Sequence, residues 1–145
     1  MMFPKPQKRP KKPFKFLKRS YIKKRAYKKK TPRKKLVQRL DELVSEIVRK
    51  RTPYCVICRK KEQLGAGHLF SRRYYATRWD IENNVFTQCW PCNYKHVRDP
   101  MPYYTWFQDK YGYEKFRQVY EMTKPVKKFS NKDLEELYVR LQNST

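Results

Sequence analysis

Four cysteines form two pairs with the same spacing, Cys55-x2-Cys58 and Cys89-x2-Cys92, with 30 residues between the pairs. A C-x-x-C turn directs two sulfur atoms toward one point, and four thiolates complete the tetrahedral coordination of zinc. Such a site is closed, because no coordination position is left for a substrate. The two pairs therefore predict a structural zinc ion that holds the fold together.

A second set of residues has the types needed to hydrolyse a phosphodiester bond. His68 lies between the cysteine pairs, Asn84 precedes the second pair, Asn93 follows it directly, and His96 comes three residues later. A neutral imidazole can take a proton from an attacking water. A hard divalent cation needs oxygen or nitrogen ligands and open positions at the phosphate. We expect a strand with His68 to pack on a helix opened by the second pair, with base and metal ligand flanking one phosphate.

The order C-x-x-C, G-H, N-V, Q-C-x-x-C-N resembles the HNH (ββα-metal) nucleases. The stretch from residue 54 to 113 is similar to the phage NinG/Rap recombination endonucleases, through Gly67-His68, Asn84, Gln88-Cys89, Cys92-Asn93, His96, Tyr103 and Gly112. This resemblance implies a ββα-metal core and structure-selective cleavage of branched DNA in phage recombination.

The resemblance also implies roles for individual residues. His68 matches the general base, and Asn84 matches the asparagine that fixes the loop carrying the base. Asn93 matches a ligand of the catalytic Mg or Mn, and His96 is a candidate second ligand; His68, Asn93 and His96 form the candidate ligand set.

Two positions depart from the family pattern. Gly67 stands where many HNH enzymes have a metal-binding Asp or His, and Phe86 stands where a histidine is expected. Weak metal affinity and loss of catalysis are the consequences to test. Outside the pattern, His68 would be interpreted as a packed histidine, and Asn84 and Asn93 as turn and cap residues.

The charge of the chain is high and unevenly distributed. The 145 residues contain 37 Lys and Arg against 13 Asp and Glu, a formal net charge of +24. Residues 1–35 contain 17 of the basic residues and no acid. Self-repulsion of this size indicates a polyanionic partner, and DNA fits best.

Residues 1–30 combine lysines with prolines and lack an apolar period, so we expect a disordered arm that binds phosphates without sequence preference. The candidate nucleic-acid contacts are Lys23, Lys24, Arg25, Lys28, Lys29 and Lys30 in the arm, and Arg72, Arg73, Arg78 and Lys95 beyond it.

The remaining chain is divided into an amphipathic helix over 31–52 and a zinc-bound domain over 53–145. The helix has Thr31 as N-cap and an apolar stripe from Leu36 to Val48, which indicates packing on the domain or, as the alternative, a dimer seam. Strands are predicted at 65–70 and 84–87. Three later helices are predicted: one from Asp99-Pro100 to Gly112, one over Glu114–Met122, and one opened by a capping box from Ser130 to Asp133. Trp79, Trp90 and Trp106 are expected in the core rather than as base-stacking platforms.

The predicted fold is thus α+β and mainly helical: a zinc-stapled ββα-metal core flanked by helices, with a basic arm. The predicted function is an Mg- or Mn-dependent HNH endonuclease that cuts branched, Holliday-junction-like phage DNA, with a homodimer possible because such junctions are two-fold symmetric. The alternatives are a non-catalytic zinc-containing nucleic-acid binder and, less favoured, a protein whose arm folds into a larger assembly. Paired cysteines and the lack of an apolar span or signal peptide predict a cytoplasmic, nucleoid-associated protein without a membrane partner.

Overall fold

The computed structural model describes residues 31–143, and the first element is the helix α1, Pro32–Arg51. The hydroxyl of Thr31 caps it by accepting a hydrogen bond from the Lys34 N–H at 3.3 Å, and Pro32 occupies the first turn, where its missing N–H costs nothing. The helix predicted over 31–52 is confirmed. The basic arm of residues 1–30, with its six candidate contacts, lies outside the described residues.

The sheet is one antiparallel hairpin of β1, Leu64–His68, and β2, Val85–Cys89. Its register runs from Leu64 opposite Cys89 to His68 opposite Val85. One end of the hairpin therefore carries a cysteine, and the other end carries His68 and the 69–84 loop. Both predicted strands are confirmed, although β1 ends at His68 rather than at residue 70.

Four helices follow the hairpin: α2, Trp90–His96; α3, Met101–Tyr111; α4, Tyr113–Thr123; and α5, Asn131–Asn143. The helix α2 starts at Trp90, between the two cysteines of the pair that was expected to open it, because it follows β2 without a loop. Gly112, with φ of 85°, separates α3 from α4 in the left-handed region that favours glycine. The capping box before α5 is confirmed, because Ser130 Oγ accepts from the Asp133 N–H at 3.1 Å and Asp133 accepts from the Ser130 N–H at 2.7 Å.

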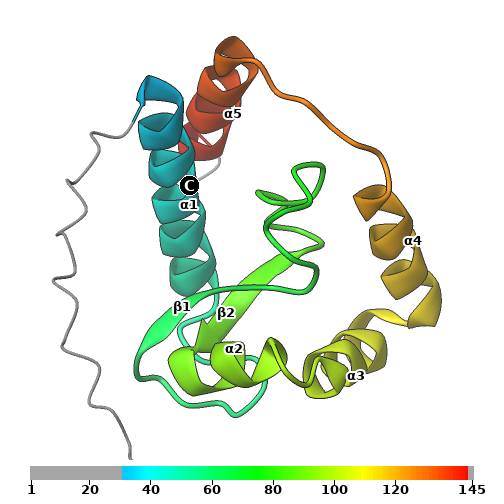
Figure 1. The fold of residues 1–145 in the computed structure, drawn as a ribbon. Helices are drawn as coiled ribbons and strands as arrows, with labels where there is room; N and C mark the ends of the chain where they lie inside the picture. The colour runs from blue at the N-terminus through cyan, green and yellow to red at the C-terminus, as the bar shows by residue number, and fades with distance from the viewer. Residues whose placement is uncertain (1–30, 144–145) are drawn as a thin grey trace, which may run out of the picture.

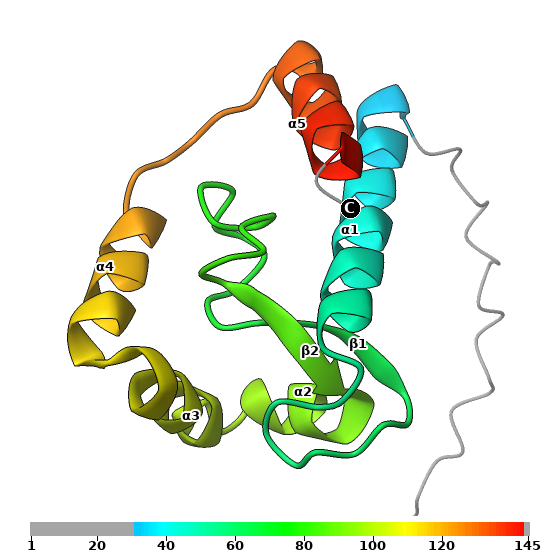
Figure 2. The ribbon, with the colours of Figure 1, turned by 180° about the vertical axis from the view of Figure 1, so that it is seen from behind.

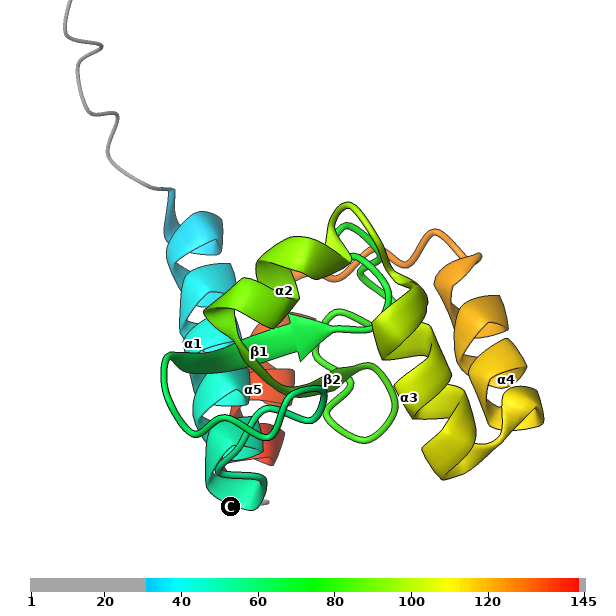
Figure 3. The same cartoon turned by 90° about the horizontal axis from the view of Figure 1, so that it is seen from below.

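The described part is an α+β fold in which the hairpin lies between helices on several sides (Figure 1). The helices α1 and α5 lie side by side, α4 lies on the opposite side, and the segment 124–130 connects α4 to α5 (Figures 1 and 2). Seen from below, α2 crosses the hairpin and α3 continues toward α4 (Figure 3). The 69–84 loop occupies the middle of this arrangement.

Two hydrophobic clusters hold the helices to the hairpin. The aliphatic cluster joins α1 and α5 through buried residues Leu40, Val44, Ile47, Val48, Trp79, Val85, Leu134 and Leu141. The aromatic cluster joins β2, α3 and α4 through buried residues Val56, Leu69, Phe70, Phe86, Tyr103, Phe107 and Val119.

The apolar stripe of α1 is covered by the chain itself, which confirms packing on the domain. A homodimer remains a prediction, and it would need another surface. Among residues 31–143, no helix has the length and apolarity required to cross a membrane.

Candidate functional site

The four cysteines converge on one point. Their sulfur atoms all lie within 4.8 Å of one another, and Cys58 Sγ is 3.5 Å from Cys89 Sγ. Zinc–sulfur bonds of about 2.3 Å place the sulfurs of a tetrahedral site roughly 3.8 Å apart, so the spacing suits zinc. A backbone hydrogen bond at Lys60 and the neighbouring thiols lower the pKa of Cys58, whereas burial raises the pKa of Cys89 and of Cys92. Cys58 is therefore the thiol that ionises most readily, and a bound metal ion would displace the protons of the others.

Each cysteine pair sits on a backbone turn that aims its sulfurs inward. In the first pair the Cys55 N–H donates to Lys60 O at 2.7 Å, and Arg59 adopts a positive φ of 64°. In the second pair Cys89 ends β2 and is also the N-cap residue of α2, while Cys92 lies in the first turn of α2. An ion bound by all four sulfurs would therefore fix α2 against the hairpin.

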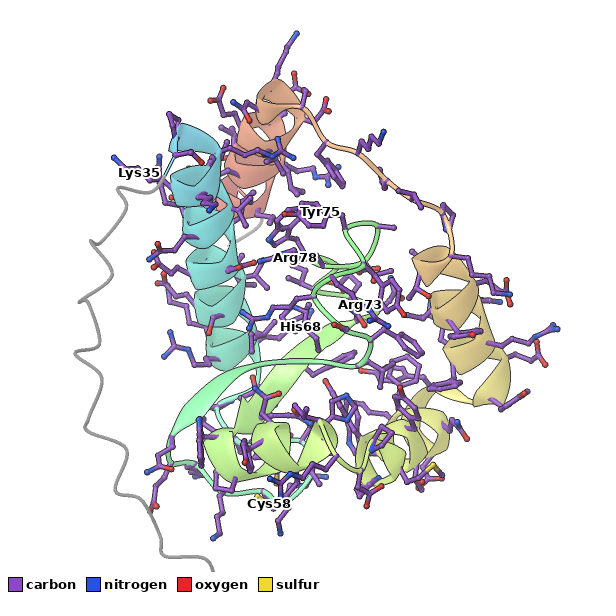
Figure 4. All side chains as sticks on the ribbon, in the orientation of Figure 1. Lys35, Cys58, His68, Arg73, Tyr75 and Arg78 are labelled. Atoms are coloured by element: carbon purple, nitrogen blue, oxygen red, sulfur yellow. The ribbon has the colours of Figure 1, made fainter. Side chains whose placement is uncertain are left out.

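His68 lies at the other end of the hairpin, where Figure 4 shows it with Arg78 between α1 and the 69–84 loop. Its Nε2 is 3.0 Å from the carbonyl oxygen of Arg78. A carbonyl can only accept, so a neutral ring carries its proton on Nε2 and leaves the lone pair on Nδ1. Burial, opposed by this hydrogen bond, lowers the pKa of His68 to about 4, so the ring is neutral at pH 7.

Asn84 fixes the loop that follows His68. The side chain is fully buried; its oxygen accepts from the Phe70 N–H at 2.7 Å, and its amide donates to Phe70 O at 3.1 Å and to Thr77 O at 3.0 Å. The backbone N–H of Leu69 also donates to Asn84 O at 2.8 Å. One side chain thus ties the start, the middle and the end of the loop together.

An ion pair attaches the same loop to α1. The Arg78 guanidinium donates to both carboxylate oxygens of Asp41, at 3.0 and 2.6 Å, and Trp79 Nε1 donates to the same carboxylate at 2.9 Å. The hydrogen bond to Asp41 raises the pKa of Arg78. Sequence reasoning named Arg78 as a nucleic-acid contact, yet its guanidinium is committed to Asp41, and Asp41 was not predicted at all.

An open cleft of about 1070 Å³ collects most of the remaining predicted site residues. His68, Asn93, Arg72 and Arg73 all line it, together with His96. No Asp or Glu of the described residues lines this cleft, so its charge comes from arginines. Figure 4 shows Arg73 on the side of the loop that faces α4.

Lys95 is exposed on α2 but is not among the residues that line the cleft. Of the predicted contacts beyond the arm, Arg72 and Arg73 are therefore the two that the fold brings to His68 and Asn93.

His96 connects α2 to the end of β1. Its Nε2 is 3.2 Å from Leu69 O, and its ring meets the Tyr103 ring edge-on at 5.0 Å. Burial lowers its pKa, and in the described part of the chain its Nδ1 is buried without a hydrogen-bond partner. With Nε2 facing a carbonyl, Nδ1 is the atom left to bind an ion, and its burial limits access.

The two departures from the family pattern have structural explanations. A Cβ on Gly67 would lie 2.2 Å from the side-chain oxygen of Gln88, so the Gln88 carboxamide fills the space that a side chain at 67 would need. Both polar atoms of this buried carboxamide lack a hydrogen-bond partner among the described residues. Phe86 packs in the aromatic cluster, 5.1 Å from Trp106 between ring centroids.

Two of the three tryptophans lie in the core, as predicted, and the third is exposed. Trp79 is buried and Trp106 packs against the aromatic cluster, as expected. The prediction was wrong for Trp90, which is 63% exposed in the first turn of α2 and lines the cleft. Cys89 and Cys92 lie on either side of Trp90 in the sequence and face the four-cysteine cluster. The Trp90 side chain therefore points away from that cluster, toward solvent.

Fold and site together define a small α+β protein in which a four-cysteine cluster that could hold zinc joins a hairpin to a helix. The chain belongs to the bacteriophage lambda NinG protein family, whose model matches residues 4–145. This membership confirms the predicted phage family, whereas the HNH superfamily stays a prediction. Searches of curated proteins and of solved structures gave no match.

Proposed function

We propose that this protein is a metal-dependent endonuclease of the HNH type that hydrolyses phosphodiester bonds in branched phage DNA. The observation that carries the proposal is the shared cleft of His68 and Asn93, which lie on a hairpin–helix unit in the order that the resemblance requires. Family membership supports the NinG part of the resemblance, and that resemblance implies a role in phage DNA recombination. Zinc at the cysteines would stabilise this unit and take no part in the chemistry.

His68 acts as the general base. Because Nε2 donates to Arg78 O, the Nδ1 lone pair takes the proton of a water in the cleft. The water oxygen forms a bond to phosphorus as the bond from phosphorus to the 3′ oxygen breaks, the leaving 3′ oxygen takes a proton from solvent water, and His68 then releases its proton to solvent. The products are a 5′-phosphate end and a 3′-hydroxyl end, as is usual for HNH enzymes.

Arg72 and Arg73 attract the DNA backbone and stabilise charge on the reacting phosphate. Asn84 and the pair formed by Asp41 and Arg78 act as positioning groups, since they hold the loop and the carbonyl that orients His68.

A catalytic Mg or Mn ion fits this cleft only in part. Asn93 offers an amide oxygen, but the described lining has no carboxylate, the ligand that such ions favour. When bound, the ion would polarise the phosphate and stabilise the leaving oxygen. We therefore expect weak affinity in the free protein, with DNA phosphate oxygens supplying further ligands.

The acid-free cleft also favours a second candidate function, a zinc-containing nucleic-acid binder without catalysis. The cleft is lined by arginines and lacks a carboxylate that could hold a metal ion. Such a lining suits the binding of phosphate without its hydrolysis. This candidate and the nuclease differ in what His68 does, because binding alone does not need a base.

The deciding experiment measures cleavage of a labelled four-way junction and of plain duplex by wild type and His68→Gln, with Mg²⁺ or Mn²⁺ and with a chelator control. We expect metal-dependent cutting of the junction that falls about 10²- to 10⁴-fold in the variant while junction binding persists. Tight binding by wild type without cutting under either metal would overturn the nuclease and support the binder.

A further inference from the structure

The helix α2 exposes two stacked aromatic rings beside the cleft. Trp90 and Tyr94 lie one turn apart and are 63% and 49% exposed. Their ring centroids are 5.3 Å apart and the planes meet at 11°, so the rings are nearly parallel. Arg98 extends the row, with its guanidinium 5.3 Å from the Tyr94 ring centroid and its Nη2 donating to the Tyr94 hydroxyl at 3.2 Å. We call Trp90, Tyr94 and Arg98 the stacking ladder.

The position of the ladder links it to the proposed chemistry. Trp90 and Tyr94 line the same cleft as His68 and Asn93, and Asn93 lies between them in the sequence of α2. A flat apolar surface is thus placed next to the groups assigned to the phosphate. Exposed apolar patches mark interaction sites, and two parallel exposed rings match a ligand with a flat face.

The charge around the ladder narrows the choice of ligand. Arg72 and Arg73 line the cleft, Arg98 lies on the ladder, and no acid of the described residues lines the cleft. The ligand should therefore combine flat rings with repeated negative charge. Nucleic acid has both, since every base offers a π-face and every linkage carries a charge.

We propose that the stacking ladder binds an unpaired nucleobase of the DNA, adjacent to the phosphate that faces His68. This inference rests on the proposed function, because it names the feature of branched DNA that the same cleft selects. In a continuous duplex both faces of each base are covered by neighbouring bases, so the ladder can take only a base that has left the stack.

This arrangement gives selectivity for DNA structure rather than for sequence. Unstacking a base costs least at a branch point, a mismatch or a single-stranded end. Every base can stack on an aromatic ring, so the ladder adds affinity at such points whatever the sequence. Because Tyr94 is held between Trp90 and Arg98, its ring supports one face of Trp90, and the other face of Trp90 is left for the base. This support is in place before binding, so less conformational entropy is lost on binding.

The test compares binding of three labelled DNAs by the full-length, zinc-loaded protein without added Mg²⁺ or Mn²⁺. The DNAs are a single strand, a fork with unpaired arms and a fully paired duplex of equal length. We expect Trp90→Leu to raise the Kd for the strand and fork on the order of tenfold, and the Kd for duplex by less than about twofold. Tyr94→Leu, which removes the support of the Trp90 ring, should have the same selectivity with a smaller effect. Trp90→Phe, which keeps a ring, should retain most of the wild-type affinity.

Tyr111→Leu is the matched control, since Tyr111 is 39% exposed and has Lys110 5.1 Å above its ring but does not line the cleft. It should bind all three DNAs like wild type. A second measurement needs no variant: an abasic nucleotide at the branch should weaken wild-type binding to the fork, and should change little with Trp90→Leu. Equal losses of affinity for all three DNAs, or no effect of the abasic nucleotide, would overturn the proposal that the stacking ladder binds an unpaired base.

The two proposals fail separately. If wild type never cuts but the ladder variants lose affinity for unpaired DNA, the nuclease is wrong and the base-binding surface stands. If wild type cuts junctions and the ladder variants bind and cut like wild type, the nuclease stands and the ladder is wrong.

Discussion

The two ends of the same hairpin are held by different physical means. At the end where Leu64 pairs with Cys89, four sulfur atoms lie within 4.8 Å of one another, ready to share one ion. At the end where His68 pairs with Val85, a buried amide and an ion pair hold the 69–84 loop by hydrogen bonds. The fold and the proposed chemistry therefore have separate supports, about the length of one strand apart.

The largest effect is expected from the cysteine end. Cys89→Ser should abolish tight zinc binding and cooperative folding, because apparent binding energies of structural zinc sites, about 10–16 kcal/mol, are comparable to or exceed the stability of a small domain. Near-ultraviolet circular dichroism with and without zinc would measure the loss. Wild type treated with a chelator should lose the same circular dichroism signal and regain it when zinc is restored. A native spectrum in the Cys89→Ser variant would contradict a structural role for zinc.

At the loop end, Asn84→Ala should destabilise the protein by about 3 kcal/mol, since it removes three hydrogen bonds of a fully buried amide and leaves backbone groups unpaired. Urea unfolding would measure this change. Cobalt substituted for zinc gives a thiolate absorption that should stay unchanged, because the cysteines are untouched. Loss of that absorption would mean that the two ends are not independent.

The middle of the hairpin offers a matched pair of glycines. Gly67→Ala should cost about 1–3 kcal/mol, because the new methyl group meets the Gln88 carboxamide, whereas Gly65→Ala has no atom within 4 Å to meet. In a Gln88→Ala background the cost of Gly67→Ala should shrink. A double-mutant cycle from chemical denaturation measures the coupling, and equal costs at 65 and 67 would contradict it.

The smallest effect is a pH dependence at the loop end. Burial, helped by the positive charges of Arg72 and Arg78, lowers the pKa of His68 from 6.5 to about 4, and the hydrogen bond to Arg78 O and the charge of Asp41 oppose this shift. Above pH 6.5 the ring is neutral in both states; as the pH falls toward 4 the unfolded chain binds the proton first, so stability is lost. Between pH 7.5 and about 5.8 wild type should lose about 1 kcal/mol more than His68→Gln. Identical losses in the two proteins would show that His68 does not carry the dependence.

The elements with local signals could be predicted from the sequence. The helix from Thr31-Pro32, the capping box at Ser130 and the paired cysteines depend on residues within a few positions of one another. The order of His68 and Asn93 around the second cysteine pair also brought both to one cleft. The helix cap, the capping box and each cysteine pair depend on short-range chemistry and not on the tertiary fold, whereas the meeting of His68 and Asn93 was implied by the family resemblance.

The rest could not be predicted because it depends on contacts between distant residues. Arg78 looks like any basic residue until α1 brings Asp41, 37 positions earlier, against it. The constraint on Gly67 depends on a strand register that places Gln88 two positions along the partner strand. Trp90 was assigned to the core by residue type, and its exposure follows from the residue at which α2 begins.

The pairing of α1 with α5 has a consequence for synthesis at the ribosome. Arg33 donates to Asn131 at 3.0 Å, and the two residues are 98 positions apart. The helix α1 therefore leaves the exit tunnel long before α5 is translated. Until then, Leu40 and Val44 lack the contacts with α5 that bury them in the folded protein. The cysteine pairs, by contrast, are complete once residue 92 has emerged. We expect nascent chains stopped before α5 to hold zinc and to be bound by chaperones through the bare stripe of α1.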